Sequence, residues 1–232
     1  MEKLSLSQAI KTLEYPGSGI ISGKSADGSC AISAFFICGV GMRMTNRVFV
    51  EDGDSISIEA FGIEEIPKNL LYRPIMVNEN RLLIGNSSHV EYLYQKYVSR
   101  PRAACAFSDV KCMDDEPFFT PRISCLVDIS GHEPNYTFNI AKKSGSAALN
   151  QTFNISNIEN GTGYMLTAFE GSSYPPMAYE GEPCAIKLEG SIFDVVADVW
   201  ENLRSETRVS LWVRSIDLHS HKAISRIINR NR

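Results

Sequence analysis

The chain has 232 residues, of which 44% are hydrophobic and 22% charged, and its 23 Lys and Arg against 27 Asp and Glu give a net charge of −4. This composition is typical of a folded globular protein and excludes a disordered, collagen-like or coiled-coil chain. The acidic balance argues against a broad basic face, so we expect no non-specific binding to nucleic acid.

The sequence carries no sign of export or membrane insertion. The first residues lack a basic segment followed by an apolar one, and the longest apolar stretch, residues 31–40, is much shorter than the roughly 20 residues that cross a bilayer. The six cysteines show no Cys-x-x-Cys spacing, so we interpret them as reduced thiols rather than disulfides or metal ligands. We therefore expect a cytoplasmic protein that does not contact a membrane.

Strands joined by tight turns dominate the first half of the chain. Turn residues such as Asp-Gly between apolar runs favour hairpins. We expect paired strands at residues 20–21 and 30–38, at 47–50 and 55–60, and at 75–77 and 81–84. Within residues 55–60, Ile56, Ile58 and Ala60 alternate with polar residues and should face the interior.

Two helices and further strands follow. Ser88 and Glu91 form a capping box at the start of a helix, and Pro101 either stops or restarts the helical run. A second helix begins near Ser191 and carries an apolar face that must pack on a sheet. That face consists of Ile192, Phe193, Val195, Val196, Val199, Trp200 and Leu203. Further strands are expected at residues 122–129, 136–141, 164–169, 184–188, 208–216 and 223–228.

This pattern of many strands and few helices indicates an α+β fold, with two packed sheets covered by helices. No linker rich in Pro, Ser or Gly interrupts the pattern, so we expect residues 1–232 to form a single domain. A fold class by itself leaves the function open.

Familiar catalytic motifs are absent from the sequence. It contains no Gly-x-x-x-x-Gly-Lys-Ser/Thr phosphate loop, no Gly-x-Gly-x-x-Gly motif, no Gly-x-Ser-x-Gly elbow and no His-Glu-x-x-His. The four histidines lie in unrelated stretches, which argues against a zinc site.

A few short polar clusters remain as candidates. Arg47 and Arg122 each begin an expected strand, where an arginine serves either as a surface cation or as a bidentate clamp for an anion. The polar run 86–89 precedes a helix and is either an anion cradle or an ordinary cap. Tyr72 precedes the third hairpin, and an acidic turn at residues 179–183 introduces a late strand.

Five motifs occur along the chain in a fixed order. They are Tyr15-Pro16-Gly17-Ser18-Gly19, Asn46-Arg47-Val48-Phe49-Val50, Tyr72 with Asn86, Phe119-Thr120-Pro121-Arg122-Ile123 and Tyr179-Glu180-Gly181-Glu182-Pro183. In this order and register they resemble the motifs of the archaeal-type IMP cyclohydrolase family, including its longer bacterial relatives. The resemblance covers nearly the whole chain.

The resemblance implies a four-layered αββα sandwich of the N-terminal-nucleophile hydrolase type, but without an N-terminal nucleophile, since Met1 is followed by Glu2. It also implies closure of FAICAR, the formamido-imidazole-carboxamide ribonucleotide, to IMP with loss of water in the last step of purine nucleotide synthesis. The partner is then a purine ribonucleotide, and the chemistry needs no metal and no cofactor. Relatives also indicate an assembly of identical subunits.

Ring closure is intramolecular, so holding the carboxamide nitrogen close to the formyl carbon supplies much of the rate. Under the resemblance, Tyr72 donates a hydrogen bond to the formyl oxygen, and one carboxylate takes the amide proton or orients the carboxamide. The candidate carboxylates are Asp114, Asp115 and Glu116. The candidate substrate-binding residues are Arg47, Asn86, Arg122 and Thr167.

The sequence departs from the family pattern at three places. The arginine of the first motif is Ser18, a family glutamate falls on Met113, and His-Thr-Tyr of the relatives is replaced at residues 167–169. Loss of one hydrogen-bonding group from a preorganised site costs about 10²–10³ in rate. Two hypotheses follow: a working IMP cyclohydrolase with a rearranged carboxylate, and a relative that binds a purine nucleotide or another phosphorylated ligand without turnover.

Overall fold

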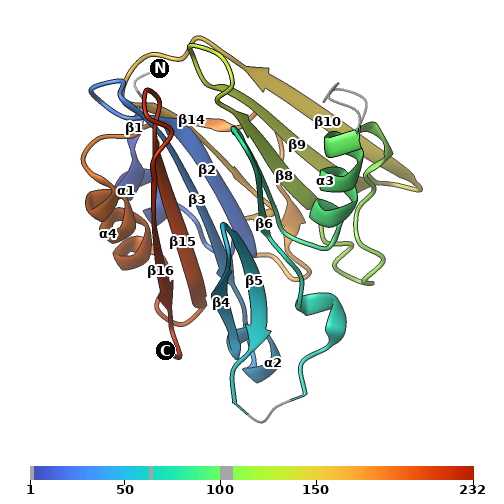
Figure 1. Cartoon of the computed structure of the whole chain (residues 1–232). Helices are drawn as coiled ribbons and strands as arrows, with labels where there is room; N and C mark the ends of the chain where they lie inside the picture. Colours follow the sequence, from blue (N-terminus) through green and yellow to red (C-terminus); the bar gives the residue numbers. More distant parts are fainter. Residues whose placement is uncertain (1–2, 63–64, 100–106) are drawn as a thin grey trace.

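Two seven-stranded sheets lie face to face, and helices cover their outer faces (Figure 1). The computed structural model describes residues 3–62, 65–99 and 107–232. The first sheet has the order β1 (Leu4–Ser5), β14 (Cys184–Lys187), β11 (Thr162–Thr167), β2 (Ser18–Lys24), β3 (Cys30–Cys38), β15 (Arg208–Asp217) and β16 (Ala223–Asn229). The second has the order β10 (Ala147–Ile155), β9 (Asn135–Ser144), β8 (Arg122–Asp128), β7 (Arg81–Gly85), β6 (Ile75–Asn78), β5 (Ser55–Ala60) and β4 (Arg47–Asp52).

The remaining elements are short. A separate pair is formed by β12 (Phe169–Glu170) and β13 (Met177–Ala178). The helices are α1 (Leu6–Lys11), α2 (Met42–Thr45), α3 (His89–Ser99) and α4 (Ile192–Asn202), with single 3₁₀ turns η1 (Lys68–Leu70) and η3 (Phe107–Asp109). In the described ranges, no helix has the length and apolar character needed to cross a membrane.

Three apolar cores fix the order of the layers. The main core lies between the sheets, where Phe35 of β3 stacks on Phe49 of β4 at 5.7 Å between ring centroids. A second core joins α1 and α4 to the first sheet, and a third joins α3 to the second sheet. The layers therefore run helix, sheet, sheet, helix, which confirms the predicted α+β class and the covered two-sheet arrangement.

The three predicted hairpins are present as β2–β3, β4–β5 and β6–β7. In the first turn the Asp27 carboxylate accepts hydrogen bonds from Ser25 Oγ at 2.6 Å and from the Ser29 amide at 3.0 Å. Gly28 follows with φ +75°, a conformation that favours glycine. The turn residues thus set the register of this hairpin, as their chemistry predicts.

Some predicted details are wrong. Ala60 is exposed, because β5 contacts β6 only near Ile56 and its far end extends beyond the core. Phe193 is 60% exposed, since it lies on the side of α4 that faces away from the sheet and contacts the Arg226 guanidinium instead. The strand predicted at residues 164–169 ends at Thr167, and Phe169 begins β12.

Other predictions fall partly outside the described residues. Helix α3 begins directly after Ser88, but Pro101, where its end or restart was predicted, lies outside the described ranges, as does Cys105. The other cysteines are free thiols. These are Cys30, Cys38, Cys112, Cys125 and Cys184.

Candidate functional site

A cavity of about 500 Å³ lies at one end of the sandwich, where strands of both sheets end. It is lined from the first sheet by the start of β2 and the end of β3, and from the second by the start of β4 and the end of β7. The loop before β8 and the loop between β12 and β13 complete the wall. Its size lies within the range of small-molecule sites in proteins.

The first motif of the sequence forms one wall of this cavity. Gly17 has φ +65°, and a Cβ at this position would approach the Phe169 ring to 2.7 Å. The Gly17 carbonyl accepts from the Cys38 amide at 2.7 Å, and the Phe169 amide donates to Pro16. Glycine is therefore required here for the backbone to lie against Phe169 and to join β2, β3 and β12.

Arg47, the first residue of β4, brings a buried cation to the cavity. The residue is 4% exposed, and its Nε donates to the Met44 carbonyl at 2.9 Å. Burial lowers the pKa of Arg47, opposed by Tyr72, Tyr15 and Cys38. Since a guanidinium stays protonated in proteins, the cavity holds a positive charge.

The groups around this cation carry no compensating charge. Burial raises the pKa of Tyr72 to about 12 and that of Cys38 to about 12, and it also raises the pKa of Tyr15. All three are therefore neutral at ordinary pH, and no carboxylate is among the groups that act on Arg47 within the described chain. A buried charge without a partner is costly, so this arrangement favours an anionic ligand.

Tyr72 is placed to donate a hydrogen bond. It is 8% exposed, it lines the cavity, and the positive charge of Arg47 opposes the rise in its pKa. A phenol that stays protonated is a donor to any oxygen that gains negative charge beside it.

Of the three predicted carboxylates, Asp115 lines the cavity, and Asp114 and Glu116 are not among the lining residues. The Asp115 carboxylate bridges residues 115 and 120 of the loop before β8. Its Oδ1 accepts from the Thr120 amide at 2.6 Å, and its Oδ2 accepts from Thr120 Oγ1. The Asp115 carbonyl also accepts from the amides of residues 118 and 119. This closed turn presents Met113, Asp115, Phe118 and Thr120 to the cavity.

Asn86 lines the cavity, but its amide group is engaged with the protein backbone. Nδ2 donates to the Pro121 carbonyl at 2.8 Å, and Oδ1 accepts from the Ile123 amide at 3.0 Å. The side chain therefore ties the end of β7 to the start of β8 and holds the wall of the cavity in position.

Arg122 and Thr167 are not among the residues that line the cavity. The Arg122 Nη1 donates to the Lys111 carbonyl at 3.3 Å, and its charge acts on His89, whose pKa is lowered to about 3 first by burial and second by Arg122. The Thr167 hydroxyl is buried and donates to the Phe169 carbonyl at 3.0 Å. The structure thus brings Arg47, Tyr72, Asn86 and Asp115 together and leaves these two residues apart from them.

An aromatic pair at the cavity was not predicted from the sequence. Phe118 and Tyr174 come from different loops and meet edge to face at 5.8 Å between centroids. Tyr174 is 83% exposed, and Phe118 is also exposed. The loop between β12 and β13 that carries Tyr174 contains no recognisable motif. A second aromatic pair in the cavity wall, Tyr15 and Phe169, stacks at 6.3 Å between ring centroids and lies in segments that the sequence had singled out.

All three departures from the family pattern reach this cavity, through Ser18, through Met113, and through Ala168 and Phe169 of residues 167–169. Within the described ranges, no group of three or more His, Cys, Asp or Glu residues is arranged to hold a metal ion. The polar side chains that line the cavity therefore comprise one guanidinium, phenols, hydroxyls, one thiol, two amides and one carboxylate.

Comparison with known protein families identifies one match. A family model described as IMP cyclohydrolase-like protein matches residues 15–221, a range that includes every cavity residue named above. A search of curated proteins finds no match.

Proposed function

The chain belongs to the IMP cyclohydrolase-like family, and from this premise we propose that it closes FAICAR to IMP in the cavity between the two sheets. The proposal rests chiefly on Arg47, a buried guanidinium in the cavity wall that has no carboxylate partner in the described chain. A ligand with a phosphate dianion supplies the missing negative charge.

The ring-closing step asks little of the protein beyond geometry and hydrogen bonds. The carboxamide nitrogen attacks the formyl carbon, forming one C–N bond, and the formyl oxygen leaves as water after it has gained two protons. Both reacting groups are on the same imidazole ring, so binding the phosphate and the ring in one orientation supplies much of the acceleration.

In this proposal Tyr72 donates to the formyl oxygen as negative charge develops there. Because its pKa is raised, the Tyr72 phenol stays protonated and is available to donate this hydrogen bond. Asp115 is the carboxylate of the cavity wall, and it takes the amide proton or orients the carboxamide. Asn86 acts as a positioning residue, because both ends of its amide hold the backbone of residues 121–123.

The aromatic pair suits the other end of the substrate. Phe118 and Tyr174 offer apolar ring faces and edges at the cavity, and a planar imidazole or purine packs well against such surfaces. The phosphate then lies toward Arg47, while the heterocycle lies toward the two loops. We further assign the helix–sheet–sheet–helix layers to the N-terminal-nucleophile hydrolase type and the protein to the cytoplasm, which its free cysteines support.

A second function is favoured by a specific observation. Both Asp115 carboxylate oxygens already accept from Thr120, and an apolar side chain, Met113, occupies the wall beside them. A cavity without a free carboxylate binds a purine nucleotide through Arg47 but does not remove the amide proton. The alternative is therefore a nucleotide-binding relative without turnover.

One assay separates the enzyme hypothesis from the binding hypothesis. It measures the formation of IMP from FAICAR by the purified protein against spontaneous closure in the same buffer. The enzyme hypothesis predicts turnover well above background that Asp115→Asn abolishes, with Glu116→Gln as a matched control that retains it. The binding hypothesis predicts background rates with tight IMP binding, and a gain of turnover in Met113→Glu. If the folded protein shows neither turnover nor IMP binding, both hypotheses are rejected.

A further inference from the structure

On one side of the sandwich the two sheets end in strands that face each other. These are β16, the last strand of the first sheet, and β4, the last strand of the second. In β16 the Arg230 amide donates to Val209, so alternate residues, including Ile228, bond to β15. Ser225, Ile227 and Asn229 therefore direct their backbone N–H and C=O groups to the free side.

The same alternation applies to β4. The Phe61 amide donates to Asn46, so Val48 and Val50 bond to β5, while Phe49 and Glu51 direct their backbone groups to the free side. The two free edges thus lie opposite each other, a condition that proteins normally cover or protect.

The side chain of Asn229 bridges the two strand edges. Asn229 is buried, its Oδ1 accepts from the Phe49 amide at 2.8 Å, and its Nδ2 donates to the Phe49 carbonyl at 3.0 Å. This amide occupies both backbone groups of Phe49 in the way that the peptide of a neighbouring strand would.

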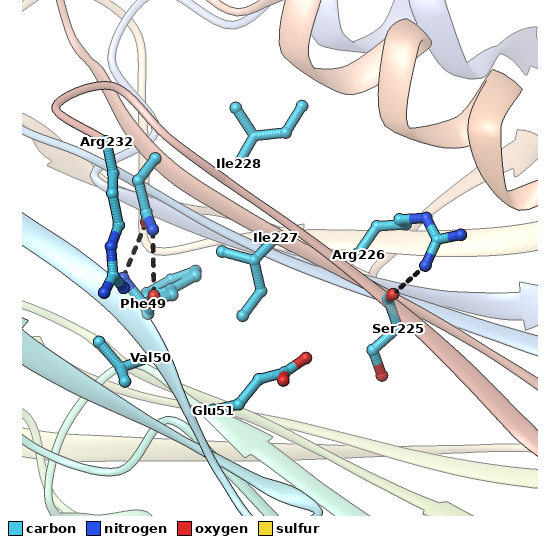
Figure 2. Close-up of a pocket in the computed structure, with 9 residues that line it drawn as sticks. Phe49, Val50, Glu51, Ser225, Arg226, Ile227, Ile228 and Arg232 are labelled. Atoms are coloured by element: carbon cyan, nitrogen blue, oxygen red, sulfur yellow. Dashed lines mark hydrogen bonds between the residues drawn. The ribbon is translucent and has the colours of Figure 1, made fainter.

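Residues of β4 and β16 on either side of this contact line a cleft of about 730 Å³. Figure 2 shows Ile227 and Glu51 along the cleft and Arg232 and Arg226 at its opposite ends. Arg226 donates to the Ser225 carbonyl at 2.9 Å, but the backbone groups of Ile227 and Glu51 have no hydrogen-bond partner in the part of the chain that the structure describes. The cleft therefore combines apolar side chains with unsatisfied strand edges.

The charge of the cleft is predominantly positive. Arg226 and Arg232 are both exposed, and neither lies within ion-pair distance of a carboxylate among the described residues. Glu51 is the acidic residue of the cleft lining. Two β16 strands placed side by side would bring their arginines together, which disfavours a second copy of this chain at this edge.

We propose that the cleft binds an extended acidic segment of a partner protein, which adds as a strand to the free edge of β16. Main-chain hydrogen bonds to Ile227 and to the Ser225 amide supply the affinity, as in other complexes that extend a sheet. Acidic side chains of the segment pair with Arg226 and Arg232, and alternate apolar side chains pack on Ile227. The arginines thus prevent self-association and select a strand of opposite charge.

A displayed library of random nonapeptides, selected on the intact protein and in parallel on Arg226→Glu, tests this proposal. We expect selected peptides in which Asp or Glu alternates with Val or Ile, and no such peptides from Arg226→Glu. By fluorescence anisotropy, a selected peptide should bind Arg226→Glu about five- to tenfold more weakly than wild type. Arg204→Glu, an exposed charge reversal outside the cleft, is the matched control and should bind normally.

Two further measurements identify the mode of binding. N-methylation of every second peptide residue should weaken binding by about fivefold or more in one of the two alternate sets, namely the set whose N–H groups donate to the strand edge. Bound peptide should slow amide hydrogen exchange at Ile227. Selection without acidic enrichment, equal binding of the N-methylated peptide, or protection confined to other strands would each overturn the proposal. A dimer of the free protein whose interface protects the β16 amides from exchange would also overturn it.

Discussion

Strand β4 contributes residues to both the cavity and the cleft, and the two sites differ in whether their arginines are buried. At its start Arg47 brings a buried guanidinium to the cavity between the sheets, and near its end Glu51 lines the cleft beside β16, where Arg226 and Arg232 are exposed. Both sites are cationic, yet the guanidinium of one is buried and those of the other are exposed.

The difference shows what burial does to a charge. A guanidinium taken out of water interacts strongly with an ion that enters the same space, and its cost is offset only when such an ion is bound. An exposed arginine remains solvated, and each pair that it forms contributes about 0–1 kcal/mol. We therefore expect the cavity to determine affinity for a small anion, and the cleft to select among partner strands.

The largest effect is expected from the phenol of the cavity. Tyr72→Phe removes the donor to the developing oxyanion and should lower turnover of FAICAR by about 10²–10³. Affinity for IMP, measured by calorimetry, should stay within about threefold, because the transition state uses this hydrogen bond more than the ground state does. Tyr92→Phe, on the exposed face of α3, is the control, and equal turnover in the two variants would remove the role of Tyr72.

A matched pair of asparagines compares the two regions directly. Asn86 at the cavity and Asn229 at the cleft are both buried, and each amide bonds to a backbone N–H and a backbone C=O of another strand or loop. Replacing either residue with Ala should lower the free energy of unfolding by about 2 kcal/mol in urea denaturation.

Function should distinguish the same pair. Asn86→Ala loosens the cavity wall and should also weaken IMP binding, whereas Asn229→Ala should leave IMP affinity unchanged. Loss of IMP affinity in both variants would show that the two regions are coupled rather than separate.

A further prediction concerns pH and His89. Its pKa is lowered from 6.5 to about 3 in the folded protein, mainly by burial, so the unfolded chain takes up the proton first. Stability contributed by neutral His89 is present above pH 6.5 and is lost as the pH falls toward 3, by up to about 1.4 kcal/mol per pH unit. The free energy of unfolding, measured in urea between pH 7 and 4, should therefore fall more steeply with decreasing pH for wild type than for His89→Gln. Parallel curves would contradict the assignment.

The smallest effect should come from the cleft. Arg226→Glu reverses an exposed charge that is remote from the cavity lining, so IMP affinity and FAICAR turnover should remain within about twofold of wild type. A large loss of IMP affinity would mean that the substrate binds through the cleft charges, and the contrast between the two regions would fail.

Local chemistry made much of the fold predictable. The Asp27-Gly28 turn and the capping box of Ser191 with Asp194 specify their structures within a few residues. Strand β10 was missed because its sequence, with Asn150, Gln151 and Asn154, lacks an apolar alternation and mostly lies exposed at the sheet edge. Exposure of Ala60 and Phe193 depends on which neighbours cover each face, and sequence periodicity does not contain that information.

The cavity was predictable only in part. Arg47, Tyr72, Asn86 and Asp115 were candidates and do meet, because the ends of their strands and loops converge at one end of the sandwich. Arg122 begins a strand just as Arg47 does, but its guanidinium turns to the Lys111 carbonyl. Phe118 and Tyr174 meet through a contact between two distant loops, which no local pattern encodes.

The most direct test of the account compares IMP with inosine on wild-type protein and on Arg47→Met, which keeps an apolar stem but removes the charge. The two ligands differ by the phosphate alone. We predict that Arg47→Met weakens IMP by about 100-fold, as expected for a buried charge that loses its partner, and weakens inosine by less than threefold. Equal weakening of both ligands in a folded variant, or unchanged IMP affinity, would contradict the assignment of Arg47 as the phosphate receptor of this cavity.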